Sequence, residues 1–258
     1  MDDAVYVDWA FRIHDEGWLG REIFRRAPLY PYFLSLMFRI SGNNVMFVYA
    51  LQVILGLCVV GLIYGMGRII FSERAGLIGA ALAVLYAPLT IHETKILPGV
   101  LGVFLGTLAM YLFARSEYEK KWRLSFWGAW VLGLAILCLP QCLLLLPLMV
   151  LAVVLRYGMK VSRWIAPASK TAAIICLVVG FVTLRNYIVG KDFVLISANA
   201  GVTFSLGNNS RAFGGMSPVP GISGSATKQL QEEVDAAERS EGRPLKLSEV
   251  DRYWFGQG

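Results

Sequence analysis

The long apolar runs of the sequence constrain its fold most. A helix needs about 20 mostly apolar residues to cross about 30 Å of hydrocarbon. Four runs meet this requirement, at residues 45–67, 75–92, 97–114 and 170–186. The sequence therefore predicts an all-α polytopic membrane protein.

A fifth run, residues 124–155, is too long for one ordinary span. Pro140 and Gln141 lie at its middle, and proline interrupts a helix because it lacks an N–H and its ring collides with the preceding turn. We interpret the run as a hairpin of two short helices, which gives about six spans in all. One long kinked helix is the alternative.

The composition agrees with a membrane setting. Hydrophobic residues make up 56% of the 258 residues and charged residues 16%, which is too apolar for an ordinary soluble domain. The net charge of +6 does not indicate nucleic-acid binding, because Lys and Arg cluster between the apolar runs. All four cysteines lie inside apolar runs, so they predict neither disulfides nor a zinc site.

The basic residues predict an orientation, because short loops rich in Lys and Arg stay in the cytoplasm. Such loops lie at residues 68–74, 115–123 and 156–170. Residues 1–43, the turn at 92–97 and everything after Arg185 are then expected on the extracytoplasmic side. Four outer arginines do not fit this rule: Arg12, Arg21, Arg25 and Arg26.

We divide the chain into three regions: an extracytoplasmic loop at 1–43, a transmembrane bundle at 44–186, and an extracytoplasmic segment at 187–258 that ends abruptly. In the loop, one apolar helical stripe predicts a helix that lies on the membrane surface. The stripe consists of Tyr6, Trp9, Ala10 and Ile13. A second short helix is predicted over residues 28–40, which two prolines would start.

The last region is expected to be mixed. Residues 191–210 are rich in β-branched, aromatic and turn-forming residues, which predicts short strands and loops. Ser248 is then expected to cap a polar helix.

Charged residues at the outer face are the candidates for chemistry, because charges at a membrane are costly. The orientation brings several of them together from three parts of the chain: Asp2, Asp3, Asp8, Glu93, Lys95 and Arg185. A carboxylate there can take a proton from a hydroxyl, and Lys or Arg can hold a phosphate as it gains charge.

Each candidate also has a structural interpretation. Asp2 and Asp3 are the type of residue that favours the positive end of a helix. Glu93 and Lys95 can be an interfacial pair at a turn, and Arg185 can be a charge that reaches out from a helix end. The residues alone leave both interpretations open.

Several segments, taken in order, resemble a known family. They are the acidic pair with Tyr6 and Trp9-Ala10, then GWLG, RAPLYPYFLSL, GRIIFSERAGLIGAAL, YAPLTIHETKILP and LRNYIVGKDFVLISANAGVTFSLGNN. This order resembles GT-C membrane glycosyltransferases of family 39, the dolichyl-phosphate-mannose protein mannosyltransferases and bacterial aminoarabinose-lipid transferases. The resemblance covers nearly all of the chain.

The resemblance implies a GT-C-like helical bundle and an integral-membrane, inverting glycosyltransferase. Asp2 would be the base that takes a proton from the acceptor hydroxyl, with Asp3 beside it, while the sugar leaves a polyprenyl phosphate. A phosphate leaving group needs charge stabilisation, which suits Lys95 or Arg185. The substrate-binding residues assigned with this reading are Tyr6, Glu93, Lys95, Arg185 and Asn186.

The expected partners are a polyprenyl-phosphate sugar donor, membrane lipid and an unidentified hydroxyl acceptor, without nucleic acid, metal or other cofactor. The expected location is a bacterial inner membrane, with the active site on the extracytoplasmic side. Family members have a span before the acidic pair and further spans later, which predicts a fragment. Many of them also have Arg where this chain has Leu139. A lipid or small-solute transporter (flippase) and an inactive fragment of the transferase are the alternative functions.

Overall fold

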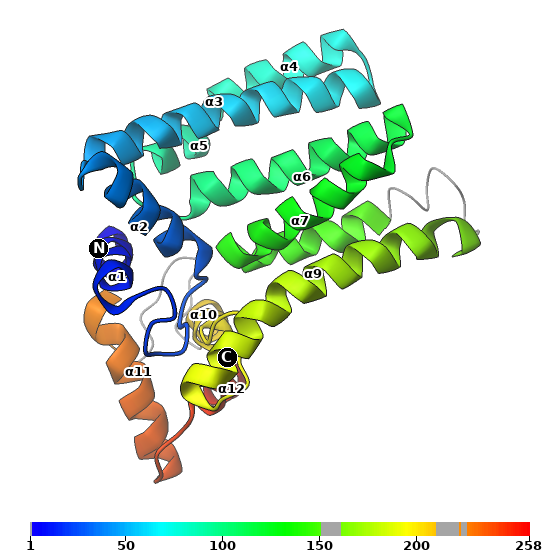
Figure 1. Cartoon of the computed structure of the whole chain (residues 1–258). Coiled ribbons are helices and arrows are strands. Elements are labelled where there is room, and N and C mark those ends of the chain that lie inside the picture. The colour runs from blue at the N-terminus through cyan, green and yellow to red at the C-terminus, as the bar shows by residue number, and fades with distance from the viewer. Residues whose placement is uncertain (1, 151–160, 210–221, 223–225) are drawn as a thin grey trace. The chain divides into compact units, whose positions relative to one another are not determined.

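The computed structural model describes residues 2–150, 161–209, 222 and 226–258. The chain forms two compact units, one of Met1–Pro31 with Phe181–Gly258 and the other of Tyr32–Gly180. We call them unit 1 and unit 2. The described residues form helices and no strand (Figure 1), so the all-α prediction is confirmed.

Among the described residues, three helices are long and apolar enough to cross a membrane: Val45–Ile70, Gly99–Glu119 and Ala168–Gly190. The first two are α3 and α6, and the third belongs to α9 (Val161–Gly190). They confirm helices at three of the four predicted runs. The short helix predicted over residues 28–40 is also present, as α2 (Leu29–Ser41).

The prediction of one helix over residues 75–92 is wrong. The chain forms α4 (Glu73–Leu85) and α5 (Ala87–Glu93), and Tyr86 between them has extended backbone with φ −78° and ψ 90°. Pro88 lies in the first turn of α5. Proline opposes continuation of a helix through the preceding turn, but the first turn of a new helix accepts it. The break therefore follows from Pro88.

The hairpin interpretation of the long apolar run agrees with the described residues. After α7 (Trp122–Cys138), Leu139 is extended and η1 (Pro140–Leu144) begins. A Cβ atom on Gly102 of α6 would meet Leu139, and one on Gly106 would meet Leu145. The chain after Leu139 therefore runs back along α6. The end of the predicted run lies outside the described residues.

The basic turns at residues 68–74 and 115–123 share one end of unit 2. A Cβ atom on Gly65 near the end of α3 would lie 2.9 Å from the ring of Tyr111 near the end of α6. At the opposite end, Gln52 of α3 donates a hydrogen bond to the carbonyl of Lys95. The basic turns at residues 68–74 and 115–123 therefore lie together, as the charge pattern predicts. Which side of a membrane this end faces remains a prediction.

Glycine permits close packing of α3 on α4 (Figure 1). A Cβ atom on Gly76 would lie 2.6 Å from the backbone oxygen of Tyr64, whereas one on Gly79 would lie 3.4 Å from a methyl group of Ile63. Since backbone cannot move aside as a side chain can, we expect Gly76→Ala to lower the free energy of unfolding by about 1–3 kcal/mol. Thermal unfolding of the purified protein in detergent measures this change.

Gly79→Ala is the matched control, because it lies on the same helix and gains a similar helix propensity of about 1 kcal/mol. It is expected to unfold at or above the temperature of the parent. Equal unfolding temperatures for the two variants would contradict close backbone packing at Gly76.

In unit 1, α1 (Asp2–Glu16) has the predicted amphipathic pattern. Tyr6, Ala10 and Ile13 are buried, and Trp9 contacts Phe24 with a centroid distance of 5.7 Å. The helix and its apolar stripe are therefore confirmed. This stripe packs against protein, so it is not the face that α1 could offer to lipid.

The strands predicted over residues 191–210 are wrong, because α10 (Ala200–Asn208) occupies the second half of this segment. The carboxylate of Asp251 accepts a hydrogen bond of 2.7 Å from the backbone N–H of Gly201, in the first turn of α10. Strand propensity depends strongly on context. Here the context is the hydrogen bond to Asp251, which lies far along the chain, so the local sequence does not reveal it.

The predicted cap at Ser248 is also wrong, because α12 (Leu247–Gln257) starts after Lys246. The carboxylate of Glu249 accepts a hydrogen bond of 2.8 Å from the N–H of Lys246, which satisfies a free donor at the helix start. Ser248 instead donates its hydroxyl hydrogen to Asp192. This contact helps to fasten α12 to the segment that follows α9.

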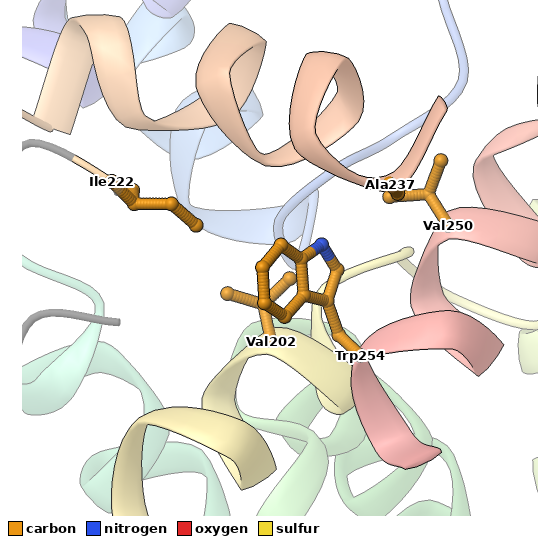
Figure 2. Close-up of a cluster of buried hydrophobic side chains, with 5 residues drawn as sticks. All are labelled: Val202, Ile222, Ala237, Val250 and Trp254. Atoms are coloured by element: carbon orange, nitrogen blue, oxygen red, sulfur yellow. The ribbon is translucent and has the colours of Figure 1, made fainter. Parts of the chain in front are cut away.

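Trp254 is at the centre of the apolar cluster of unit 1. Figure 2 shows its indole between Val202 of α10 and α11 (Ala226–Glu241), which supplies Ala237. The indole N–H donates a hydrogen bond of 3.1 Å to the carbonyl of Glu233. One side chain therefore connects three helices.

Candidate functional site

The acidic pair lies in the first turn of α1. Asp2 and Asp3 begin the helix, where free backbone N–H groups favour negative charge. Asp3 is partly buried, and the side chain of Asp2 lies outside the described part of the structure. Tyr6 follows one turn later on the same side, because residues three and four apart are neighbours on a helix.

Tyr6 is buried between an aromatic and a basic side chain of unit 1. Its ring meets that of Tyr30 edge to face at a centroid distance of 5.5 Å. The guanidinium carbon of Arg26 lies 5.7 Å from its ring centroid, within the range of a cation–π contact. Arg26 thus lies beside the helix that carries the acidic pair. In the sequence, the only signal that Arg26 gives is that it does not fit the charge rule.

α11 supplies a carboxylate that the sequence pattern does not single out. Glu233 is buried, and its Oε1 atom has no hydrogen-bond partner among the described residues. Burial raises the pKa of Glu233, and outweighs the opposite effects of a hydrogen bond with Gln229 and of the charges of Arg25 and Arg26. Arg25 also donates a hydrogen bond of 2.6 Å to the carbonyl of Leu230. Two of the four arginines that do not fit the charge rule therefore interact with α11.

The raised pKa of Glu233 predicts a pH-dependent stability. Between the ordinary pKa of a glutamate and the higher pKa of Glu233 in the folded state, the folded state binds more protons, so stability falls as pH rises through this window. We expect Glu233→Gln to raise the unfolding temperature at pH 7, and the gain to vanish near pH 4. Glu241→Gln, at an exposed position of α11, is the control. A lower unfolding temperature of Glu233→Gln at pH 7 would show that burial does not outweigh the favourable contacts of the Glu233 carboxylate.

Arg185, near the end of α9, is buried and directs its donors at carbonyl groups. Its Nε donates to the carbonyl of Leu19 at 2.8 Å, and Nη1 donates to that of Glu22 at 2.6 Å. Nη1 also donates to Oδ1 of Asn186 at 3.1 Å, and Nη2 donates to Leu19. The centroid of the Phe24 ring lies 3.8 Å from the guanidinium carbon. These contacts attach α9 to the loop that follows α1.

Asn186 is fully buried beside it. Its Oδ1 accepts a hydrogen bond of 3.3 Å from the N–H of Phe24. Its Nδ2 donates to the carbonyls of Val194 at 3.1 Å and Ile196 at 3.2 Å. Asn186 therefore joins two loop segments of unit 1 to the end of α9.

Glu93 and Lys95 lie in unit 2, at the turn after α5. Gln52 donates hydrogen bonds of 2.9 Å to both of their carbonyls, which fixes the turn on α3. The carboxylate of Glu93 lies against Gly56, where a Cβ atom would come within 1.8 Å of Oε1. Burial raises the pKa of Glu93, whereas the side chain of Lys95 is exposed.

The structure thus collects the predicted residues in two places. α1 with Tyr6, Arg185 and Asn186 belongs to unit 1, and Glu93 with Lys95 belongs to unit 2. The described part of the chain contains three helices of spanning length, and the fold is that of a multi-pass, all-α membrane protein.

Comparison with known proteins identifies the family. The sequence model of the family described as dolichyl-phosphate-mannose-protein mannosyltransferase matches residues 25–185, more than half of the chain. The chain belongs to this family of membrane glycosyltransferases. Its members' chemistry implies a sugar donor linked to polyprenyl phosphate. No curated protein and no solved structure matches the chain.

Proposed function

We propose that the chain transfers a sugar from a polyprenyl phosphate to a hydroxyl group of a lipid, glycan or protein. The reaction takes place at the extracytoplasmic face of a bacterial inner membrane. The family match over residues 25–185 carries this proposal. Unit 1 supports it, because Arg26 lies against Tyr6 on the helix that begins with two carboxylates.

In the proposed reaction, the carboxylate of Asp2 takes the proton of the acceptor hydroxyl. The acceptor oxygen bonds to the anomeric carbon from the face opposite the phosphate, and the bond from that carbon to the phosphate oxygen breaks, with inversion. The phosphate leaves with the electron pair, and Asp2 later releases its proton to water. Asp3 lies beside this base in the first turn of α1.

The leaving phosphate gains negative charge and needs a cation. Arg26 suits this role, because a guanidinium matches phosphate with paired donors and it lies against Tyr6, which follows the acidic pair on α1. Lys95, with an exposed ammonium, is the second candidate, and Tyr6 and Glu93 are proposed to contact the substrate. The donors of Arg185 and Asn186 go to groups of the protein itself, which supports a different role for these two residues.

Donor preference tests the proposal. Membranes that contain the chain, depleted of free polyprenyl phosphate, receive radiolabelled sugars linked either to polyprenyl phosphate or to a nucleotide. We expect label to leave the donor only in the polyprenyl-linked series, and only when the chain is present. Direct use of the nucleotide-linked sugars would contradict the proposed donor class.

A further inference from the structure

The end of α9 carries two adjacent buried polar side chains, Arg185 and Asn186. On the sequence alone, both are candidate substrate-binding residues. In the structure their hydrogen bonds instead go to backbone groups of two loops in unit 1 and to each other.

The hydrogen-bonding capacity of Asn186 is fully used. A side-chain amide has two acceptor positions and two N–H donors. Oδ1 accepts from Phe24 and Arg185, and Nδ2 donates to Val194 and Ile196. If the amide oxygen and nitrogen changed places, the amide N–H groups would face the N–H groups of Phe24 and Arg185. These contacts therefore also fix the orientation of the amide. No position remains for a sugar hydroxyl while this arrangement persists.

The segment that Arg185 holds, residues 17–24, forms no helix or strand. Gly17 and Gly20 have φ values of 87° and 58°, which other residues rarely adopt. A backbone hydrogen bond of 3.2 Å joins these two glycines. A Cβ atom on Gly20 would lie 2.9 Å from Nη2 of Arg185, so the loop fits closely around the guanidinium.

The held segment leads directly to the proposed reacting groups. Phe24, whose N–H bonds to Asn186, contacts Trp9 of α1, and Arg26 follows two residues later. A shift of the segment would therefore move Arg26 relative to α1. Small displacements of reacting groups are costly in catalysis.

We propose that Arg185 and Asn186 are positioning residues, which fix residues 19–24 and thereby the placement of α1 and Arg26. This inference rests on the proposed sugar transfer for its catalytic consequence. Its structural part concerns the chain alone, because neither side chain needs to touch the donor.

Hydrogen exchange of the membrane-embedded protein without donor tests the structural part. In Asn186→Ala the N–H of Phe24 loses its acceptor, so we expect this amide to exchange about tenfold faster or more. Arg185→Lys keeps the charge but lacks the planar fork, and Gly20→Ala displaces the guanidinium, so both are expected to speed exchange over residues 19–24. The controls are Asn208→Ala and Arg252→Lys, at exposed positions of the same unit.

Transfer kinetics with a radiolabelled polyprenyl-phosphate sugar test the catalytic part. The proposal predicts a lower kcat for Arg185→Lys and Gly20→Ala, with KM for the donor within about twofold of the parent. Unchanged hydrogen exchange over residues 19–24 in folded variants overturns the proposal. A higher KM for the donor with unchanged hydrogen exchange also overturns it, because that result indicates a residue that binds the donor directly. An inactive parent refutes the proposed function instead, and exchange then still decides whether the two residues hold the loop.

Discussion

Replacement of Asp2 by Asn is expected to lower sugar transfer about 100-fold or more, because a positioned general base contributes a factor of about 10²–10⁴. Asn has nearly the shape of Asp but cannot take the proton of the acceptor hydroxyl. The measurement is the initial rate at which radiolabel leaves a polyprenyl-phosphate donor in proteoliposomes that contain equal amounts of folded protein.

Asp15→Asn is the matched control, since Asp15 lies on the same helix and is exposed outside the buried stripe. It is expected to retain the rate of the parent within about twofold. If both variants match the parent, Asp2 is only a charge that favours the start of the helix. If both lose activity alike, the net charge of α1 matters and not a single base.

Trp254→Ala is expected to have the largest effect on stability. The side chain is buried at the centre of the cluster in Figure 2, and its N–H is bonded to the carbonyl of Glu233. Removal of a buried aromatic side chain leaves a cavity and typically costs about 3–5 kcal/mol. Thermal unfolding of the purified protein in detergent should show a correspondingly lower unfolding temperature.

Phe255→Ala provides the comparison, because Phe255 follows Trp254 in sequence but is about half exposed (49%). Its ring stacks on Phe204 at a centroid distance of 5.1 Å, and loss of such a pair costs about 1 kcal/mol. A loss for Trp254→Ala that is no larger than for Phe255→Ala would show that the cluster does not stabilise unit 1 as described.

The sequence predicted those parts of the fold that depend on local pattern. Run length sufficed for α3, α6 and the membrane-spanning part of α9, because a span requires little more than enough apolar residues. Periodicity sufficed for α1, whose buried face is the predicted one. Proline placed the hairpin at Pro140, yet the same signal at Pro88 was overlooked within an apolar run.

The rest depends on contacts between distant parts of the chain. The start of α10 is bonded to Asp251, which lies 50 residues later. The sequence shows the charge of Arg185, which makes it a candidate phosphate ligand, but it does not show that the carbonyl of Leu19, 166 residues away, accepts its hydrogen bond. Glu233 was missed because a carboxylate in a polar helix gives no sign of burial.

The most direct test of the account is the chemical fate of a labelled sugar in proteoliposomes that contain the purified chain and a polyprenyl-phosphate-linked donor. Sugar transfer predicts that label passes to a hydroxyl acceptor or water while one polyprenyl phosphate appears for each sugar lost, and that Asp2→Asn abolishes both. A donor that remains intact, or crosses the membrane with its sugar still attached, would contradict a glycosyltransferase.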